Sequence, residues 1–205
     1  MNEKFYTLTE EKRQAVINAG FRVFSQNSYK KSPMREIADC AGVSKSLLFH
    51  YFRNKKELYL FLWDEAARIT LETLSRYGCY EPPDLFEMME RGMRAKLAVM
   101  RIYPDMAAFA VKAFYEKDPE ICGEVRKSYR HYFGLKARNA LAGLDPEDFV
   151  PGLDLALMYR EMYLASEGYL WEMLQLGDSL DVDTLEKDFA RLLAFWKTIY
   201  LRKKS

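Results

Sequence analysis

The chain has 205 residues, of which 49% are hydrophobic and 30% charged, enough for one large or two small domains with a core. No apolar run approaches the roughly 20 residues that a membrane-spanning helix needs, and the first residues lack the apolar stretch of a signal peptide. We therefore expect a cytoplasmic protein without a membrane partner. Its three widely spaced cysteines argue against a disulfide framework.

Charge is distributed unevenly along the chain, although the net charge is only +1. Residues 1–60 hold 11 Lys and Arg against 6 Asp and Glu, whereas residues 61–205 hold 20 against 24. A basic N-terminal part on an acidic remainder concentrates affinity for nucleic acid at one end of a molecule. Chance asymmetry is the alternative, so this feature supports other observations and carries no conclusion alone.

Apolar residues recur at helical spacing along the whole chain, without a strand pattern or a repeat. Pro151 is expected to open the eighth helix, and Asp183 with Glu186 to cap the ninth. We predict an all-α fold of about nine helices, with three in an N-terminal head and six in a body. The expected ranges are about 9–27, 34–41, 44–52, 54–77, 84–102, 105–116, 119–142, 151–176 and 183 to the C-terminus.

The most informative segment is residues 33–58, which predicts two short helices joined by a tight turn and followed by a long helix. Gly42 ends the first helix, because glycine takes the left-handed conformation at low steric cost. The Ser44 hydroxyl is expected to cap the second helix. Asn54 is expected to cap the long helix, with Glu57 as its capping-box partner. A short polar second helix in such an arrangement suits the major groove of DNA.

This segment supports a family resemblance. Residues 37–38, 41–44 and 49–52, with Lys55 and Leu58, match in order and spacing the DNA-binding domain of the TetR-type family of bacterial transcriptional regulators. The resemblance covers roughly residues 8–60, while the rest of the chain is similar to the family only in length and helical character.

Two positions depart from the family pattern. Pro33 stands where the family often has Thr or Ser, so Ser32 is expected to cap the helix with Pro33 at its first position. Phe49 stands where the family often has Tyr, so a phosphate hydrogen bond from that ring is not expected.

The second helix of the motif is the expected reader of DNA. Lys45 is the best candidate for contacting guanine, Leu47 or Phe49 for contacting a thymine methyl group, and Lys55 for a backbone phosphate. A solvated helix face without a partner is the alternative. The predicted DNA-binding residues are Ser32, Met34, Arg35, Ser44, Lys45, Ser46, Leu47, Phe49, His50, Tyr51 and Lys55.

Catalysis and metal binding are not expected. His50 and His131 are the only histidines, and neither has Cys or acidic neighbours at the spacing of metal ligands. No nucleophile–base arrangement and no phosphate-binding glycine loop occurs. We predict that the protein is not an enzyme and uses no cofactor or metal.

The body is rich in Met and aromatic residues. Such residues at helical spacing most often form an ordinary core, but Met adapts to irregular shapes and Tyr offers polar groups, so an apolar pocket is also possible. The resemblance implies that a pocket of this kind binds a small effector, which we expect to be apolar. The candidate ligand-binding residues are Met89, Met93, Phe109, Phe114, Tyr129, Phe133, Met158 and Met162.

The last two helices are expected to pair two chains. Residues 153–174 carry apolar groups on more than one face, and a helix of this kind needs more than one neighbour. Burial within one chain is the alternative, but the resemblance implies a four-helix dimer interface. The candidate interface residues are Leu157, Leu164, Trp171, Leu192, Trp196 and Ile199.

Together these features predict a homodimeric DNA-binding regulator with a helix-turn-helix domain in residues 1–54 and an effector-binding and dimerisation domain in residues 55–205. We expect a repressor that leaves a palindromic operator when a small hydrophobic or aromatic ligand binds. The alternative is a DNA-binding regulator that is constitutive or is controlled by a protein partner. A ligand-binding protein that has lost DNA recognition is disfavoured by the residues of the motif, Lys45, His50, Tyr51 and Lys55.

Overall fold

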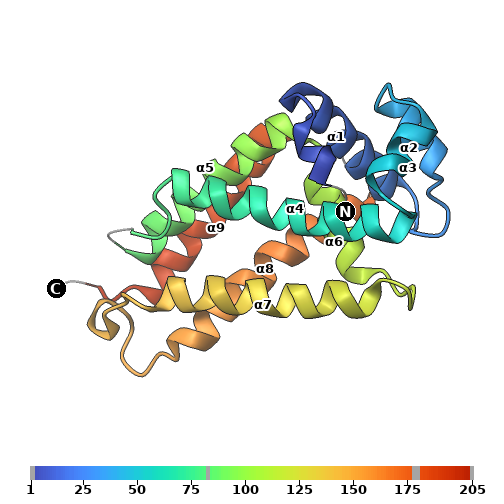
Figure 1. Cartoon of the computed structure of the whole chain (residues 1–205). Coiled ribbons are helices and arrows are strands. Elements are labelled where there is room, and N and C mark those ends of the chain that lie inside the picture. Colours follow the sequence, from blue (N-terminus) through green and yellow to red (C-terminus); the bar gives the residue numbers. More distant parts are fainter. Residues whose placement is uncertain (1–2, 82–83, 177–180, 204–205) are drawn as a thin grey trace. The chain divides into compact units, whose positions relative to one another are not determined.

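A computed structural model describes residues 3–81, 84–176 and 181–203, and α-helices make up most of these ranges (Figure 1). The all-α prediction is confirmed, and within the described ranges the only β-type pairing is an isolated bridge between Phe149 and Leu201. The short 3-10 helices are η1 (Glu3–Thr7) and η2 (Pro146–Asp148). The α-helices are α1 (Glu10–Gln26), α2 (Met34–Cys40), α3 (Lys45–Tyr51), α4 (Lys55–Arg76), α5 (Leu85–Ile102), α6 (Met106–Tyr115), α7 (Cys122–Leu141), α8 (Leu155–Leu176) and α9 (Val182–Tyr200).

The helices form two compact units. The first unit comprises Met1–Ile69 and Val99–His131, and the second comprises Thr70–Ala98 and Tyr132–Ser205. The helix-turn-helix segment therefore shares its unit with α6 and with parts of α4 and α7. The division at residue 54 concerns function, and it stays a prediction.

An aromatic cluster joins three helices of the first unit. Phe21 and Phe24 of α1 meet Phe109 of α6 with ring centroids 5.2 and 6.2 Å apart. Tyr59 of α4 contacts Phe24 at 4.8 Å and Phe109 at 5.2 Å, both edge to face. Such pairs contribute about 0.5–1.5 kcal/mol each beyond the burial of their area. The cluster therefore fixes α1, and with it the motif, on α4 and α6.

The N-terminal 3-10 helix closes the other end of this core. Phe5 is fully buried, and its ring lies 5.6 Å from Tyr51, 5.1 Å from Phe52 and 5.3 Å from Phe61, measured between centroids. The end of α3 and the first half of α4 thus pack on a residue that precedes the first long helix. No sequence pattern indicated this role for Phe5.

The second unit has its own apolar core. Leu85 and Phe86 of α5, Met162 of α8, and Leu193 and Trp196 of α9 are buried in it. Two backbone hydrogen bonds tie the chain after α9 to the loop before α8, from Val150 N–H to the Tyr200 carbonyl and from Arg202 N–H to the Asp148 carbonyl, each at 2.9 Å. The last helix is therefore anchored at its C-terminal end.

Three predicted helix starts are wrong. Pro33 is itself the N-cap of α2, and Ser32 makes no cap. Pro151 lies in a turn, and α8 begins at Leu155 after Asp154, whose carboxylate accepts from two backbone N–H groups. The cap of α9 is Asp181, which accepts from the N–H of Thr184 at 2.9 Å. At α8 and α9 an aspartate within a few positions satisfies the helix end, whereas no side chain caps the start of α2.

Gly20 provides a test of how closely α1 and α4 approach. A Cβ atom at this position would lie 2.4 Å from Cδ1 of the fully buried Leu62, whereas a Cβ at Gly134, in α7, would meet nothing within 4 Å. We expect Gly20→Ala to lower the free energy of unfolding by about 1–3 kcal/mol through overpacking. The control Gly134→Ala should raise it by up to about 1 kcal/mol through helix propensity. Denaturant unfolding followed by circular dichroism measures both, and equal effects would contradict this packing.

Candidate nucleic-acid interface

The turn between α2 and α3 has the geometry that the sequence predicts. Gly42 has a φ of 66°, and Val43 N–H donates to the Ala38 carbonyl at 3.0 Å, so the chain leaves α2 through a left-handed residue. The Ser44 hydroxyl accepts from the N–H of Leu47 at 3.1 Å and caps α3. Leu48 is fully buried and holds α3 to the core. Both predicted end signals are confirmed.

The outer face of α3 combines one cation with polar and apolar side chains. Ser44, Lys45, Ser46 and His50 are exposed. Leu47 and Phe49 are exposed as well, although large apolar side chains are usually covered. Lys45 Nζ lies 5.7 Å from the centroid of the Phe49 ring, so the cation stands beside an apolar surface. This face offers donors for phosphates and base edges together with apolar groups for thymine methyls.

Three predicted contact residues face inward instead. Tyr51 is only 9% exposed because its ring packs on Phe5. Ser32 is fully buried, and its hydroxyl donates to the Ser28 carbonyl at 3.0 Å. Met34 is buried in the same core. Their assignment to an exposed contact surface is therefore wrong for this conformation, and their side chains support the motif from within.

Arg35 remains on the surface. Its guanidinium lies 3.8 Å from the Asp39 carboxylate, and both side chains are largely exposed. An exposed pair of this kind contributes little to stability. Arg35 is thus free of strong constraints and available to a phosphate.

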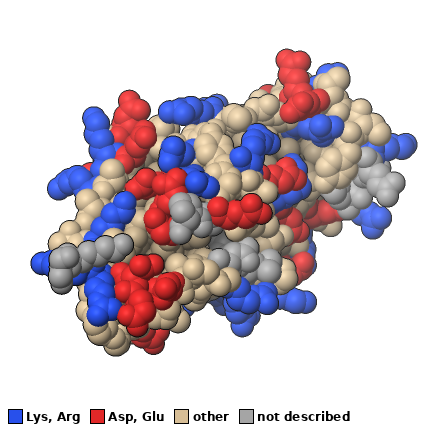
Figure 2. All heavy atoms as spheres, turned by 90° about the vertical axis from the view of Figure 1, so that its left-hand side faces the viewer, with Lys and Arg blue, Asp and Glu red and all other residues tan. Residues whose placement is uncertain are grey.

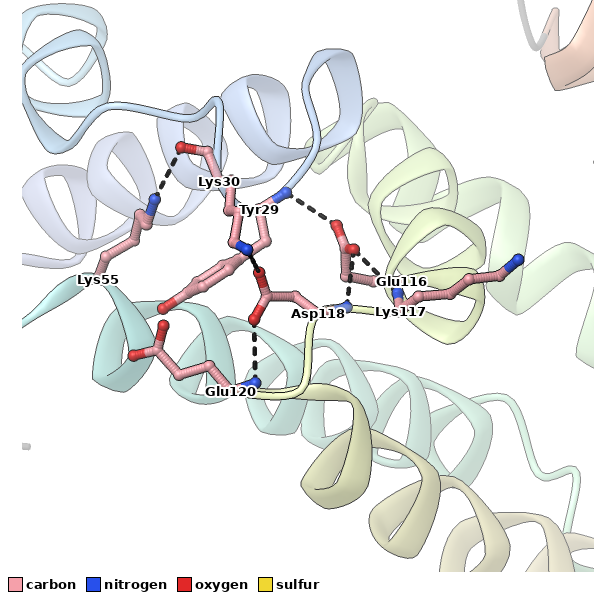
Figure 3. Close-up of polar contacts among 7 residues, drawn as sticks. All are labelled: Tyr29, Lys30, Lys55, Glu116, Lys117, Asp118 and Glu120. Carbon is pink, nitrogen blue, oxygen red and sulfur yellow. Dashed lines mark hydrogen bonds and ion pairs between the residues drawn. The ribbon is translucent and has the colours of Figure 1, made fainter.

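Lys55 is held at the start of α4 by the loop between α1 and α2 (Figure 3). Its ammonium donates to the carbonyl of Lys30 at 3.1 Å and lies 4.5 Å from the centroid of the Tyr29 ring. The helix start is fixed by Asn54, whose side chain accepts from the N–H of Glu57 at 2.8 Å. Glu57 in turn accepts from Arg53 N–H at 2.8 Å, one residue earlier than the predicted capping box requires.

Additional cations that were not among the predicted DNA-binding residues flank them. Lys30, Lys31 and Arg53 are exposed in the two loops that bracket the motif. Their positions in the sequence could have indicated them, because Lys30 and Lys31 lie shortly before α2 and Arg53 lies shortly before α4. Like Lys45 and Lys55, they belong to the first unit.

Burial and carboxylates of the segment after α6 raise the pKa of two tyrosines, one in the loop between α1 and α2 and one in α4. Burial and a hydrogen bond to Glu120 raise the pKa of Tyr29 above its ordinary value. Burial and the charge of Glu116 raise the pKa of Tyr59 in the same way.

The predicted ligand-binding residues divide between the two units. In the first unit Phe109 belongs to the aromatic cluster, and Phe114 contacts Tyr129 with ring centroids 4.5 Å apart. In the second unit Met158 and Met162 are buried. Met89 packs partly on that core, Met93 is half-buried, and the side chain of Phe133 lies outside the described residues. The burial of Phe109, Met158 and Met162 agrees with roles in the two cores, and the pocket assignment stays a prediction.

The predicted dimer residues mostly form an exposed apolar surface on α8 and α9. Leu157 and Leu164 are 63% and 53% exposed and seven residues apart on α8, and half-buried Trp171 continues that spacing. On α9 Ile199 is exposed and Leu192 half-buried, but Phe195, 57% exposed, was not predicted.

Trp196 is the exception in this set. It is 1% exposed and packs in the core of the second unit, so it has no surface to offer a partner chain. Its assignment to the interface is wrong, because the outward position of that helical turn belongs to the neighbouring Phe195. One residue along a helix rotates the side chain by about 100°.

Other site types find no support in the described part of the chain. No cluster of three or more His, Cys, Asp or Glu is arranged there to hold a metal ion. None of its helices has the length and apolar character required to cross a membrane. On the face drawn in Figure 2, acidic and basic side chains are intermingled.

Comparison with known sequences points to one family. The model of the bacterial regulatory proteins of the tetR family matches residues 16–61. The HTH-type transcriptional regulator RutR of Escherichia coli strain K12 is 32% identical over 147 residues, which are 68% of this chain and 68% of that protein. The HTH-type transcriptional repressor AcnR of Corynebacterium efficiens is 32% identical over 69 residues, 34% of this chain and 37% of that one.

Solved structures agree on the fold. The transcriptional regulator FadR of Bacillus subtilis, solved in complex with stearoyl-CoA, superposes with a TM-score of 0.68 at 19% identity over 87% of this chain and 96% of that one. A TetR family regulator of Chloroflexus aurantiacus superposes with a TM-score of 0.59 at 22% identity over 98% of this chain and 99% of that one.

Proposed function

The chain belongs to the TetR family of bacterial transcriptional regulators, and from this premise we propose that it is a homodimeric repressor released from its operator by a small apolar ligand. Because its relatives are regulators, it is a DNA-binding transcriptional regulator and not an enzyme. The observation that carries the proposal is the exposed face of α3, where Lys45 stands beside Leu47 and Phe49.

The proposed complex places α3 in the major groove. Lys45 would donate to guanine, and Leu47 or Phe49 would contact a thymine methyl group. Lys55, at the start of α4, would meet a backbone phosphate, since phosphate contacts fix the position of a protein on the duplex. One chain reads one half-site, so a palindromic operator requires two chains related by a two-fold axis.

The apolar surface of α8 and α9 supports a dimer. Leu157, Leu164, Phe195 and Ile199 are exposed in a single chain, which is costly in water unless another surface covers them. A second copy is the simplest cover, because the two heads of a dimer also explain a two-fold symmetric operator.

Release by a ligand is supported by one structural neighbour and by composition. The Bacillus subtilis FadR structure contains stearoyl-CoA. The second unit of this chain has a core with methionines at 88, 89, 158 and 162, and methionine adapts to irregular apolar ligands. A ligand that favours a head spacing unsuited to the operator lowers DNA affinity by population shift. A constitutive or partner-controlled regulator remains the alternative.

Substitutions at two lysines test the DNA complex. Lys55→Ala should weaken binding to all duplexes to a similar extent and reduce the salt slope by about one unit, because it removes one phosphate contact. Lys45→Ala should change the preference among sequences instead. Fluorescence anisotropy at several salt concentrations measures both quantities, and unchanged curves for both variants would exclude this mode of binding.

Two adjacent residues on α9 distinguish an interface from a core. Phe195→Asp should give a folded protein that sediments as a monomer, because it places a charge on the exposed apolar surface. Trp196→Asp should unfold the second unit, because it buries an unpaired charge. Sedimentation velocity and circular dichroism separate these outcomes. A dimer that survives Phe195→Asp undiminished would show that this surface is not the interface.

An effector should act on operator affinity reciprocally. The probes are stearoyl-CoA and a set of aromatic carboxylates, and we expect at least one of them to weaken operator binding about 5- to 150-fold. The operator should weaken the binding of that probe by the same factor. Met93→Trp should reduce this response and leave operator binding intact, because it fills space in the body. Calorimetry and anisotropy measure the two affinities. Unchanged affinity with every probe would favour the constitutive or partner-controlled regulator.

A further inference from the structure

The loop between α1 and α2 is fastened to the segment between α6 and α7 by contacts that DNA binding does not itself require (Figure 3). Tyr29 N–H donates to Oε2 of Glu116 at 2.9 Å. The other carboxylate oxygen, Oε1, accepts from the N–H groups of Lys117 and Asp118 at 2.9 and 3.1 Å. Glu116 thereby binds its own turn with one oxygen and the loop of the DNA-binding motif with the other.

Asp118 adds a second link between the same segments. Its carboxylate lies 3.5 Å from Nζ of Lys30, and its side chain is only 6% exposed. It also accepts from Glu120 N–H at 3.0 Å, so the carboxylate is fixed within its own turn. A buried and fixed carboxylate makes a stronger anchor than an exposed one, because less side-chain entropy is lost in the pair.

The loop held in this way is the one that holds Lys55. The Tyr29 ring is 2% exposed, and it is fixed by edge-to-face contact with Tyr59 at 5.3 Å. Two groups therefore define where the Lys55 ammonium lies. They are the ring of Tyr29 and the backbone carbonyl of the next residue, Lys30. An ammonium has three N–H donors, so a carbonyl contact leaves two for a phosphate.

We propose that Tyr29 is a positioning residue for DNA binding, that it holds the Lys55 ammonium ready for a backbone phosphate, and that Glu116 of the α6–α7 segment fixes Tyr29 for this task. This inference rests on the proposed DNA-binding function. Lysine is a flexible side chain whose rotamer freedom is lost on binding. A lysine that is already held over a ring loses less rotamer freedom when it binds, so its contact with the phosphate is stronger.

A purely structural role for Tyr29 gives a different expectation. If the residue only filled the core, its loss would weaken operator binding whether or not Lys55 was present. If it positions Lys55, its loss should matter only while Lys55 is present. A double-mutant cycle measures this difference.

The cycle uses the full chain and one operator duplex, with Tyr29→Leu, Lys55→Ala and the double variant. We expect Tyr29→Leu to weaken binding about 2- to 5-fold and to reduce the salt slope, as loss of a cation–ring contact implies. In the Lys55→Ala background the same substitution should have no effect. Tyr29→Phe keeps the ring face below Lys55 and loses the hydroxyl with its hydrogen bond to Glu120, so the part of the binding that depends on Lys55 should be unchanged.

Glu116→Gln provides a second variant that leaves the core intact. It should weaken binding in the Lys55 background and not in the Lys55→Ala background, even if Tyr29→Leu fails to fold. Equal weakening in both backgrounds, or no weakening by either Glu116→Gln or Tyr29→Leu, would overturn the inference. Absence of salt-dependent operator binding by the unchanged chain would instead overturn the proposed function.

Discussion

The packing of Phe21, Phe24, Tyr59 and Phe109 is the interaction on which the rest of the first unit depends. These rings come from α1, α4 and α6, so they make the motif continuous with residues 99–131. Close-packed protein interiors transmit displacements from one helix to the next. The orientation of α3 is therefore set by α6 as well as by the motif itself.

Signals that act over a few residues could be predicted from the sequence. The left-handed Gly42, the cap at Ser44 and the cap at Asn54 depend on the backbone within four residues, and all three are present. The number of helices and most of their bounds follow from the same local rules. The resemblance to a family rested on these positions, because the turn and its caps constrain both the residue types and their spacing.

The burial of individual side chains was harder to predict than these local signals, because it depends on segments that are distant in the sequence. Tyr51 faces inward because Phe5 of η1 covers it, and η1 had no recognisable helical pattern. Trp196 was predicted at the interface but is buried in the core, and the exposed side chain on that turn of α9 is that of its neighbour Phe195. Tyr29, which contacts Lys55, lies 26 residues before it, and Glu116, which holds Tyr29, lies 87 residues after Tyr29. No local sequence pattern indicates contacts over such separations.

The proposed function requires two copies of this chain to read a two-fold symmetric operator through α3. Selection of bound duplexes from a random pool by the purified protein tests it most directly. We expect enrichment of an inverted repeat whose half-site centres are separated by about one helical turn of DNA or a multiple of it. Enrichment of single half-sites, or of no sequence at all, would contradict it.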